Sequence, residues 1–393
     1  MNVMRIAVLT YWSSSDNYGQ LLQCYALQKY LKDYGHEVYL VRYLPEYKDL
    51  SIKPLLWSRL KGVKLRNLLP WERRRLRNEA AYEEYLRKYN KKNNELRKFN
   101  EFRETYLSFS QIVYRSIEDL RENPPQADLY ICGSDQVWHD SLFQPNVAGW
   151  YLQFGNHEVK RISYAASIGR EINPEEENVF STYLSKFDAI SLREQNACSY
   201  VRSIGFDEAV VVADPTILLP LEGFEEIFQP AIRDTKPYIF FYTLNIKTSK
   251  EIYWSEFSSI IKDENLDVKS VGSSGYYPAR NIIPDCENIQ ATIPEWISLI
   301  NDAKYVVTTS FHGVVFCIKL HKPFVAIPLA NEYSKGNARL VSLLEYVGLS
   351  DRIYSKELSI KDLLHSEISW NSVDSKMNEL RQKGIDFLDQ VLK

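Results

Sequence analysis

The stretch from Ala303 to Leu329, AKYVVTTSFHGVVFCIKLHKPFVAIPL, constrains the fold of this chain more than any other. Its run Tyr305–Thr309 is β-branched and apolar, as is typical of a strand buried on both faces. Lys322–Leu329 is a second such run, and Gly313–His321 between them has the apolar spacing of a short buried helix. The stretch therefore predicts a strand–helix–strand unit whose first turn is Ser310-Phe311-His312-Gly313.

That turn is a candidate ligand site. In open parallel sheets, ligands bind beyond the carboxyl ends of the strands. A helix that begins there points free N–H groups and the positive end of its dipole at the site, which suits an anion. His312 is an ionisable ring at such a place, so it is a candidate for proton transfer. A helix cap or a satisfied buried side chain explains a single histidine more simply.

Composition bounds the class of protein. The chain has 393 residues, which is enough for two domains that each have their own core. Its net charge of −3 gives no overall attraction to nucleic acid, so no nucleic-acid partner is expected. The five cysteines are odd in number and widely spaced, which predicts reduced thiols in a cytoplasmic protein and no metal site. The sequence has no run of about 18 apolar residues, so no membrane-spanning helix is predicted.

The N-terminal part has the pattern of a doubly wound domain. Arg5–Trp12 and Glu37–Tyr43 are predicted strands, and Gln20–Tyr34 between them is a predicted helix. The turn SSSDNYG after the first strand lacks the GxGxxG pattern of dinucleotide sites, and a helix N-cap explains its polar residues equally well. Its candidates for ligand contact are Asn17, Gly19 and Gln20.

Two later strands of this part also end in polar residues. Asp128–Cys132 is a predicted strand followed by GSDQVW, where the glycine allows close backbone approach to a ligand. Ala189–Leu192 delivers Arg193, whose guanidinium could bind a carboxylate or phosphate with two hydrogen bonds. A capped turn and a surface ion pair are the simpler alternatives. The candidates here are Gly133, Ser134, Asp135, Gln136, Arg193 and Glu194.

A basic segment lies between the predicted strands Glu37–Tyr43 and Asp128–Cys132. Between Arg59 and Arg103 there are 15 Lys or Arg residues, 6 Glu and no Asp. Apolar residues recur there at helical spacing, so one or two long helices are predicted as an insertion at about residues 45–110. A solvated helical face explains the charge most simply, and contact with an anionic or membrane-linked acceptor is the functional alternative.

A second α/β series follows. Strands are predicted at Tyr238–Leu244 and Asp267–Val271, ahead of the stretch described first. After its last strand, the polar loop Asn331–Arg339 holds the candidates Lys335, Asn337 and Arg339. The fold class expected is α/β, with an N-terminal domain at 1–220, a C-terminal domain at 221–370 and a terminal helix at 371–393.

Four segments together resemble the polysaccharide pyruvyl transferase family: NYGQ, GSDQVW, SLRE and TTSFHGVVFCIKLHKPFVAI. The resemblance covers the chain from Arg5 to about Leu349. It implies two Rossmann-like domains that face a cleft, as in GT-B glycosyltransferases, with the last helix crossing back to the first domain. It also implies transfer of pyruvate from phosphoenolpyruvate to two hydroxyls of a sugar, which gives a cyclic ketal and requires no cofactor.

The resemblance assigns roles to individual residues. His312 matches the histidine that acts as general acid in the family, and Arg193 matches the first of two donor-binding arginines. The second arginine would fall at Ser310 and is absent, so either Lys335 or Arg339 supplies the charge or the donor differs. The residues expected to contact substrate are Asn17, Gly19, Gln20, Gly133, Ser134, Asp135, Gln136, Glu194, Ser310, Phe311, Gly313, Lys335, Asn337 and Arg339.

Two alternatives remain open at this point. One is a glycosyltransferase of the same architecture that uses a nucleotide sugar, and the other is a saccharide-binding relative without catalysis. The expected partners are phosphoenolpyruvate and a saccharide acceptor. If that acceptor is lipid-linked, the expected location is the cytoplasmic face of the membrane.

Overall fold

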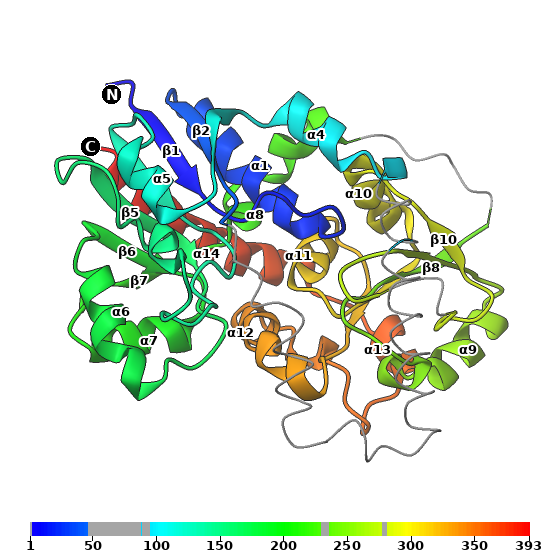
Figure 1. Cartoon of the computed structure of the whole chain (residues 1–393). Helices are drawn as coiled ribbons and strands as arrows, with labels where there is room; N and C mark the ends of the chain where they lie inside the picture. The colour runs from blue at the N-terminus through cyan, green and yellow to red at the C-terminus, as the bar shows by residue number, and fades with distance from the viewer. Residues whose placement is uncertain (1, 46–87, 89–94, 229–235, 277–280) are drawn as a thin grey trace, which may run out of the picture.

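A computed structural model of the chain describes residues 2–45, 88, 95–228, 236–276 and 281–393. Within this part, two parallel β-sheets are covered by helices (Figure 1). The first sheet contains β1 (Arg5–Leu9), β2 (Glu37–Tyr43), β3 (Phe109–Tyr114), β4 (Leu129–Cys132), β5 (Lys160–Ala166), β6 (Ala189–Leu192) and β7 (Val210–Val211). The second contains β8 (Tyr238–Tyr242), β9 (Asp267–Val271), β10 (Glu287–Ile289), β11 (Tyr305–Thr308) and β12 (Phe324–Ala326).

The helices that connect and cover the strands follow the predicted alternation. They are α1 (Tyr18–Asp33), α4 (Phe99–Tyr106), α5 (Ile117–Glu122), α6 (Glu177–Leu184), α7 (Gln195–Ser203), α8 (Pro215–Leu218), α9 (Trp254–Asp263), α10 (Ile293–Asp302), α11 (Phe311–Lys319), α12 (Asn337–Val347), α13 (Ile360–His365) and α14 (Trp370–Val391). Central strands such as β8, YIFFY, are buried along their whole length because helices cover both faces of the sheet. The predicted α/β class with two Rossmann-like sheets is confirmed.

Strand order determines where each sheet can bind a ligand. The first sheet runs β3-β2-β1-β4-β5-β6-β7, so the order reverses between β1 and β4. The second runs β10-β9-β8-β11-β12 and reverses between β8 and β11. In such sheets the binding crevice opens beyond the carboxyl ends of the strands at the reversal. The loops after β1, β4 and β11 are therefore the ones placed to build a site.

Some predicted elements were wrong. The edge strands β3 and β10 were missed, because each has exposed positions that interrupt the apolar pattern of a buried strand. Helix α11 begins at Phe311 rather than Gly313, because the Ser310 side chain accepts a hydrogen bond from the backbone N–H of Gly313 and caps the helix. Most of the predicted basic insertion, residues 46–87 and 89–94, lies outside the described residues. Its C-terminal end forms α4, after which β3 begins inside the predicted range.

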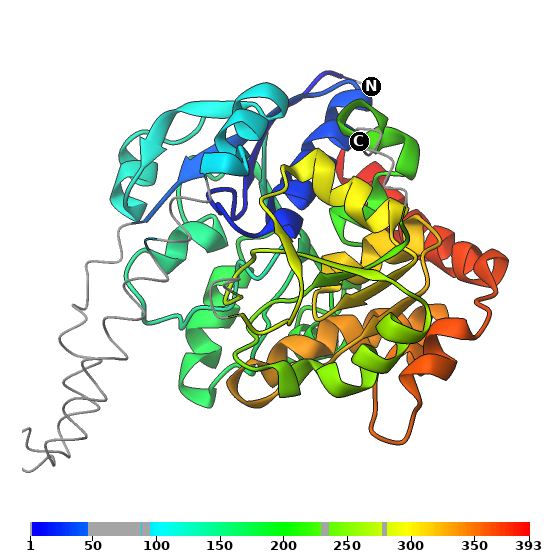
Figure 2. The ribbon, with the colours of Figure 1, turned by 90° about the vertical axis from the view of Figure 1, so that its right-hand side faces the viewer.

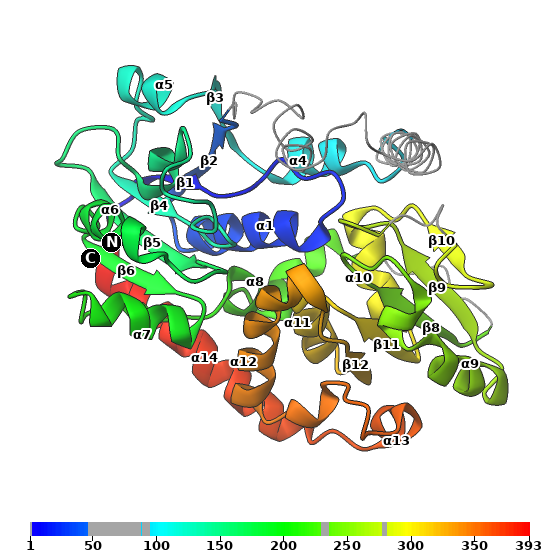
Figure 3. The ribbon, with the colours of Figure 1, turned by 60° about the horizontal axis from the view of Figure 1, so that its bottom comes forward.

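The two sheets share one hydrophobic core, which spans α1, α10 and α11. The ring of Tyr18, at the start of α1, stacks on Trp296 with 5.5 Å between centroids. Its hydroxyl donates to the carbonyl of Ala291 at 2.8 Å. In the loop before α1, Asp16 accepts a hydrogen bond at 3.0 Å from Ser274, which follows β9. The N-terminal end of α1 is therefore held against the second sheet (Figure 3).

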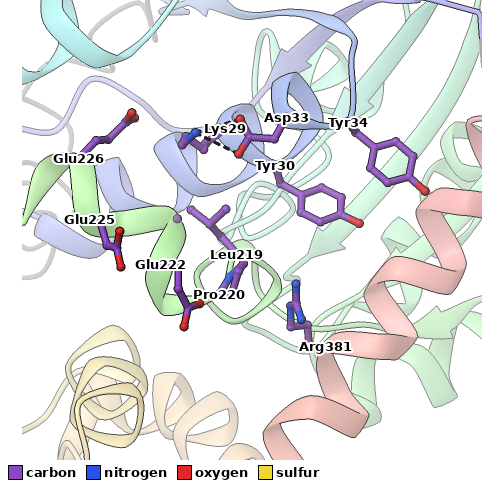
Figure 4. A pocket seen from close by; sticks show the side chains of 11 residues that line it. Lys29, Tyr30, Asp33, Tyr34, Leu219, Pro220, Glu222, Glu225, Glu226 and Arg381 are labelled. Carbon is purple, nitrogen blue, oxygen red and sulfur yellow. Dashed lines mark hydrogen bonds and ion pairs between the residues drawn. The ribbon is translucent and has the colours of Figure 1, made fainter.

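The terminal helix α14 returns to the first sheet and ends near the N-terminus (Figures 1 and 2). Arg381 donates through Nε to the carbonyl of Leu218 at 2.8 Å, and Lys160 of β5 donates to the carbonyl of Val391 at 2.6 Å. A surface cavity of about 520 Å³ lies where α1, α14 and the 3₁₀ helix η4 (Leu221–Ile227) meet (Figure 4). The domain boundaries at 220 and 370 stay predictions. In the described part, no helix is long and apolar enough to cross a membrane.

Gly384 allows α14 to pack closely on β5. An ideal Cβ at this position would lie 2.6 Å from the hydroxyl oxygen of Tyr164, a buried atom without a hydrogen-bond partner among the described residues. We expect Gly384→Ala to lower the free energy of unfolding by roughly 1–2 kcal/mol, although alanine favours a helix by about 1 kcal/mol. In a Tyr164→Phe background the oxygen is gone, and the same change should raise stability by up to about 1 kcal/mol. Urea denaturation of the four proteins measures both effects, and an equal loss in both backgrounds would contradict the packing argument.

Candidate functional site

The loops at the carboxyl ends of the strands bring one ionisable cluster together. His312 is the second residue of α11 and its imidazole is buried, with 6% of the residue exposed. Its Nε2 lies 3.7 Å from Oδ1 of Asp214, which follows β7 in the other sheet. The imidazole therefore lies between the two sheets and beside a carboxylate.

The start of α1 fixes the other side of the imidazole. An ideal Cβ at Gly19 would lie 2.1 Å from Nδ1 of His312, so a side chain has no room there. The structure places Gly19 against His312, and its predicted contact with ligand stays a prediction. Because Gly19 is in the first turn of α1, the positive ends of two helix dipoles, α1 and α11, meet at the imidazole.

Arg193 is the centre of the ion-pair network. Its Nη1 donates to Oδ2 of Asp214 at 2.8 Å, and its Nη2 lies 3.6 Å from Oδ1 of Asp135. Its Nε lies 3.6 Å from Oε1 of Glu194, and its guanidinium lies 5.0 Å from the centre of the Phe311 ring. Burial alone would lower the pKa of Arg193, but these three carboxylates raise it above its ordinary value. The guanidinium is therefore a permanent cation.

A second guanidinium, that of Arg339, reaches the cluster from α12, which follows the second sheet. Arg339 lies in the first turn of α12, and its Nη1 is 3.7 Å from the same Asp135 oxygen that Arg193 approaches. Burial and the neighbouring charge of Arg193 lower the pKa of Arg339 to about 10, so it remains charged at neutral pH. The structure thus brings Arg339 to the cluster. The side chain of Lys335, the alternative cation, lies outside the described residues.

Asp214 was not among the predicted site residues. It accepts hydrogen bonds from Ser134 Oγ and Arg193 on one oxygen, and from the backbone N–H and hydroxyl of Thr216 on the other. Burial favours its neutral form, but the neighbouring His312 and Arg193 hold its pKa far below the ordinary range. An Asp-Pro pair after a strand predicts a helix cap, and Asp214 does cap α8. Its position after β7, at the site edge of the sheet, was the one sequence signal for a further role.

The cluster contains polar atoms that the protein leaves without partners. Within the described part, Nε and Nη2 of Arg193, Nε of Arg339, Nε2 of His312 and Oε2 of Glu194 are buried and make no hydrogen bond. Buried polar groups nearly always have partners, because an unmade hydrogen bond costs about 1–3 kcal/mol. A ligand that carries acceptors would satisfy the nitrogen atoms among them, whereas Oε2 of Glu194 needs a donor.

Other predicted residues hold the backbone of the site. Asn17 caps α1 by accepting from the backbone N–H of Gln20, whose own side chain accepts from Ser14. Asn337 bonds both the N–H and the carbonyl of Leu329, at 2.8 Å each, and so fixes the loop after β12. These hydrogen bonds show that the three predicted residues hold the loops of the site in shape.

The GSDQ loop is shaped by close contacts with its neighbours. Gly133 has a φ of +110°, and an ideal Cβ there would lie 2.4 Å from the Tyr164 carbonyl, so only glycine fits. Ser134 donates to the carbonyl of Ala165, and the Gln136 amide packs against Gly169. Gly313 of α11 is similarly confined, because a Cβ there would meet the Thr308 hydroxyl at 2.4 Å. Of the loop, Asp135 alone reaches the guanidinium groups.

The residues described contain no group of three or more His, Cys, Asp or Glu that could hold a metal ion. Four of the five cysteines are buried, and all five are free thiols.

Comparison with solved structures supports the fold. The UDP-N-acetylglucosamine 2-epimerase of Rickettsia bellii superposes with a TM-score of 0.52 at 12% identity and covers 100% of this chain and 96% of its own. The UDP-GlcNAc 2-epimerase of Methanocaldococcus jannaschii has a TM-score of 0.52 at 11% identity, and the match covers 96% of this chain and 98% of the epimerase. The glycotransferase of kitacinnamycin has a TM-score of 0.51 at 10% identity, and the match covers 98% of this chain and 96% of that protein. The chain therefore has a GT-B-like fold.

A search of curated protein sequences gave no match. The family model for polysaccharide pyruvyl transferases, however, matches residues 17–331, which include the GSDQ loop, Arg193, Asp214 and His312. This chain belongs to the polysaccharide pyruvyl transferase family.

Proposed function

We propose that this protein transfers pyruvate from phosphoenolpyruvate to a sugar of a polysaccharide, or of its lipid-linked precursor, and forms a pyruvate ketal. The family assignment supports a transferase of this class. The observation that carries the proposal is the set of buried nitrogen atoms of Arg193, Arg339 and His312 that make no hydrogen bond within the described part of the protein and lie in one cluster. Phosphoenolpyruvate has a phosphate and a carboxylate that could accept from them.

In this proposal Arg339 replaces the arginine that is absent at Ser310. Its guanidinium reaches the cluster from α12, a different element from the helix that carries His312. Both arginines lie beside Asp135, so their free N–H groups face a common region. A planar guanidinium can bind a carboxylate or phosphate with two parallel hydrogen bonds. Arg193 and Arg339 would thus hold the two anionic groups of the donor.

The reaction is written as follows. His312 gives its proton to the methylene carbon of phosphoenolpyruvate, which becomes a methyl group and leaves a cationic centre at C2. A sugar hydroxyl bonds to C2 and loses its proton, and the C2–O bond to phosphate then breaks with its electron pair. A second hydroxyl bonds to C2 and loses its proton. One of the two released protons restores His312, and the other ends on the departing phosphate.

Two features suit His312 to this role. Histidine is the side chain that most often transfers protons in enzymes. Asp214, ionised and 3.7 Å from Nε2, would stabilise the protonated ring before transfer. Gly19 on one side and the adjoining Phe311 ring, 5.2 Å away, limit the orientations that the imidazole can adopt.

Replacing the acid tests its role. We expect His312→Gln to lower kcat by about a hundredfold or more, because the methylene carbon needs a positioned proton donor. Product is measured by mass spectrometry of lipid-linked oligosaccharides incubated with phosphoenolpyruvate, where a ketal adds the mass of pyruvate less one water. Near-normal turnover would remove His312 from this role, and a hexose added from a nucleotide sugar would support the glycosyltransferase alternative.

Gly19→Ala tests the position of the ring without removing it. The added methyl would occupy space held by the imidazole, so the ring must move. A displacement of about 1 Å at a reacting group can lower the rate about a hundredfold. We expect kcat to fall by at least tenfold while calorimetry still detects phosphoenolpyruvate binding. An unchanged kcat would show that the contact does not position the acid.

Arg339→Gln tests the proposed second cation. We expect the Kd for phosphoenolpyruvate to rise by about tenfold or more, because a charge-assisted hydrogen bond to an anion contributes about 1.5–3 kcal/mol. Titration calorimetry measures this, with Lys304→Gln, which removes a cation from the surface, as the control. Equal affinities of wild type and Arg339→Gln would show that another group binds the donor. Failure of the wild type to bind phosphoenolpyruvate would refute the donor itself.

A further inference from the structure

A cavity of about 500 Å³ opens directly onto the charged cluster. Its walls are the first turn of α7, the first turn of α12 and the segment that follows β5, and Glu194 and Arg339 form its inner end. This volume is within the range of sites that bind small molecules. The cavity therefore connects the solvent with the proposed reaction centre.

Glu194 presents an unused acceptor at this end. Its residue is 3% exposed, and its Oε1 is occupied by the hydroxyl of Ser167 and lies 3.6 Å from Arg193 Nε. Its Oε2 is buried and has no hydrogen-bond partner among the described residues. A carboxylate oxygen accepts hydrogen bonds, so the group that completes it must be a donor. An anionic donor substrate cannot satisfy it, whereas a hydroxyl can.

The cavity walls suit a sugar ring. Tyr200 offers an aromatic face, and Ile168 and Ile172 add apolar surface. Asn196 offers an amide for hydrogen bonding. Arg170 is held in place by an ion pair with Glu176 at 2.7 Å, so that wall is ordered before a ligand arrives. An apolar wall with a few placed polar groups is typical of small-molecule sites.

We propose that this cavity binds the acceptor as a pyranose ring with neighbouring free hydroxyls, one of which donates a hydrogen bond to Oε2 of Glu194. This inference rests on the proposed transferase function and names the place and the contact of its acceptor. In this arrangement the guanidinium groups of Arg193 and Arg339 would bind the anionic donor, and the neighbouring carboxylate of Glu194 would orient the neutral acceptor.

Two other cavities lack such a buried acceptor. In the cavity of Figure 4, Lys29 donates to both oxygens of Asp33 and Arg381 donates to a backbone carbonyl, while the glutamates that line it are exposed to solvent. In a third, of about 640 Å³, Arg161 is engaged by backbone carbonyls. Their lining thus gives no comparable reason to bind a sugar.

The test places a bulky side chain in the cavity from two of its walls and leaves the residues of the charged cluster unchanged. Asn196 and Ala338 are exposed residues on opposite walls, so Asn196→Trp and Ala338→Trp add bulk at positions that tolerate it. His157→Trp adds the same bulk to the third cavity and is the matched control. The probes are p-nitrophenyl glycosides of common hexoses and N-acetylhexosamines, followed by saturation-transfer NMR. Phosphoenolpyruvate affinity is measured in parallel by calorimetry.

We expect both tryptophan variants to weaken glycoside binding by about tenfold or more, with His157→Trp unchanged. Glu194→Gln should weaken it by about tenfold, because a hydrogen bond to a charged acceptor is lost. Glycoside binding that survives all three changes, or that is absent from the wild type, would overturn the acceptor site. Loss of phosphoenolpyruvate binding with glycoside binding intact would instead count against the proposed donor, so the two failures are distinguishable.

Discussion

The buried pairing of Arg193 with Asp214 is the interaction on which the site depends. Both side chains are removed from water, which is expensive for charges unless partners surround them. Asp214 gains those partners from Ser134, Thr216 and Arg193, so it stays ionised beside His312. These partners follow β4, β6 and β7 of the first sheet, so that sheet alone supplies the partners of the buried charge. The association of the two sheets then places His312 beside it.

That association comes from apolar contacts rather than from the charges. Tyr18 and Trp296 stack within a core shared by both sheets, and they place the first turn of α1 beside the first turn of α11. Such burial contributes about 25 cal/mol per Å² and requires no particular orientation. The same contact sets the distance between Gly19 and the imidazole. Packing thus determines the geometry at which the ionisable groups meet, and only glycine is small enough for it.

The sequence was most informative where one local pattern determines structure. The buried strands β1, β4, β8 and β11 were predicted from continuous apolar runs, and His312 and Arg193 from polar residues directly after strands. Edge strands lack that pattern, and the start of α11 depends on a cap that the apolar spacing does not reveal. Asp214 was not predicted, because an Asp-Pro pair after a strand is explained by its role as the cap of α8. The approach of Arg339 to Asp135, over about half the chain's length, depends on how the sheets pack and has no local signal.

The charge of the cluster limits how a donor could bind. Asp135, Glu194 and Asp214 oppose only Arg193 and Arg339, so the formal charge is −1 with neutral His312 and zero after its protonation. Net attraction therefore cannot account for the binding of a substrate with several negative charges. Directed hydrogen bonds can, because the free N–H groups of the two guanidiniums lie in a buried region of low dielectric, where each bond is stronger than in water. In the proposed reaction, the proton that His312 gives to the donor would also bring the formal charge of the cluster to zero before the anion enters.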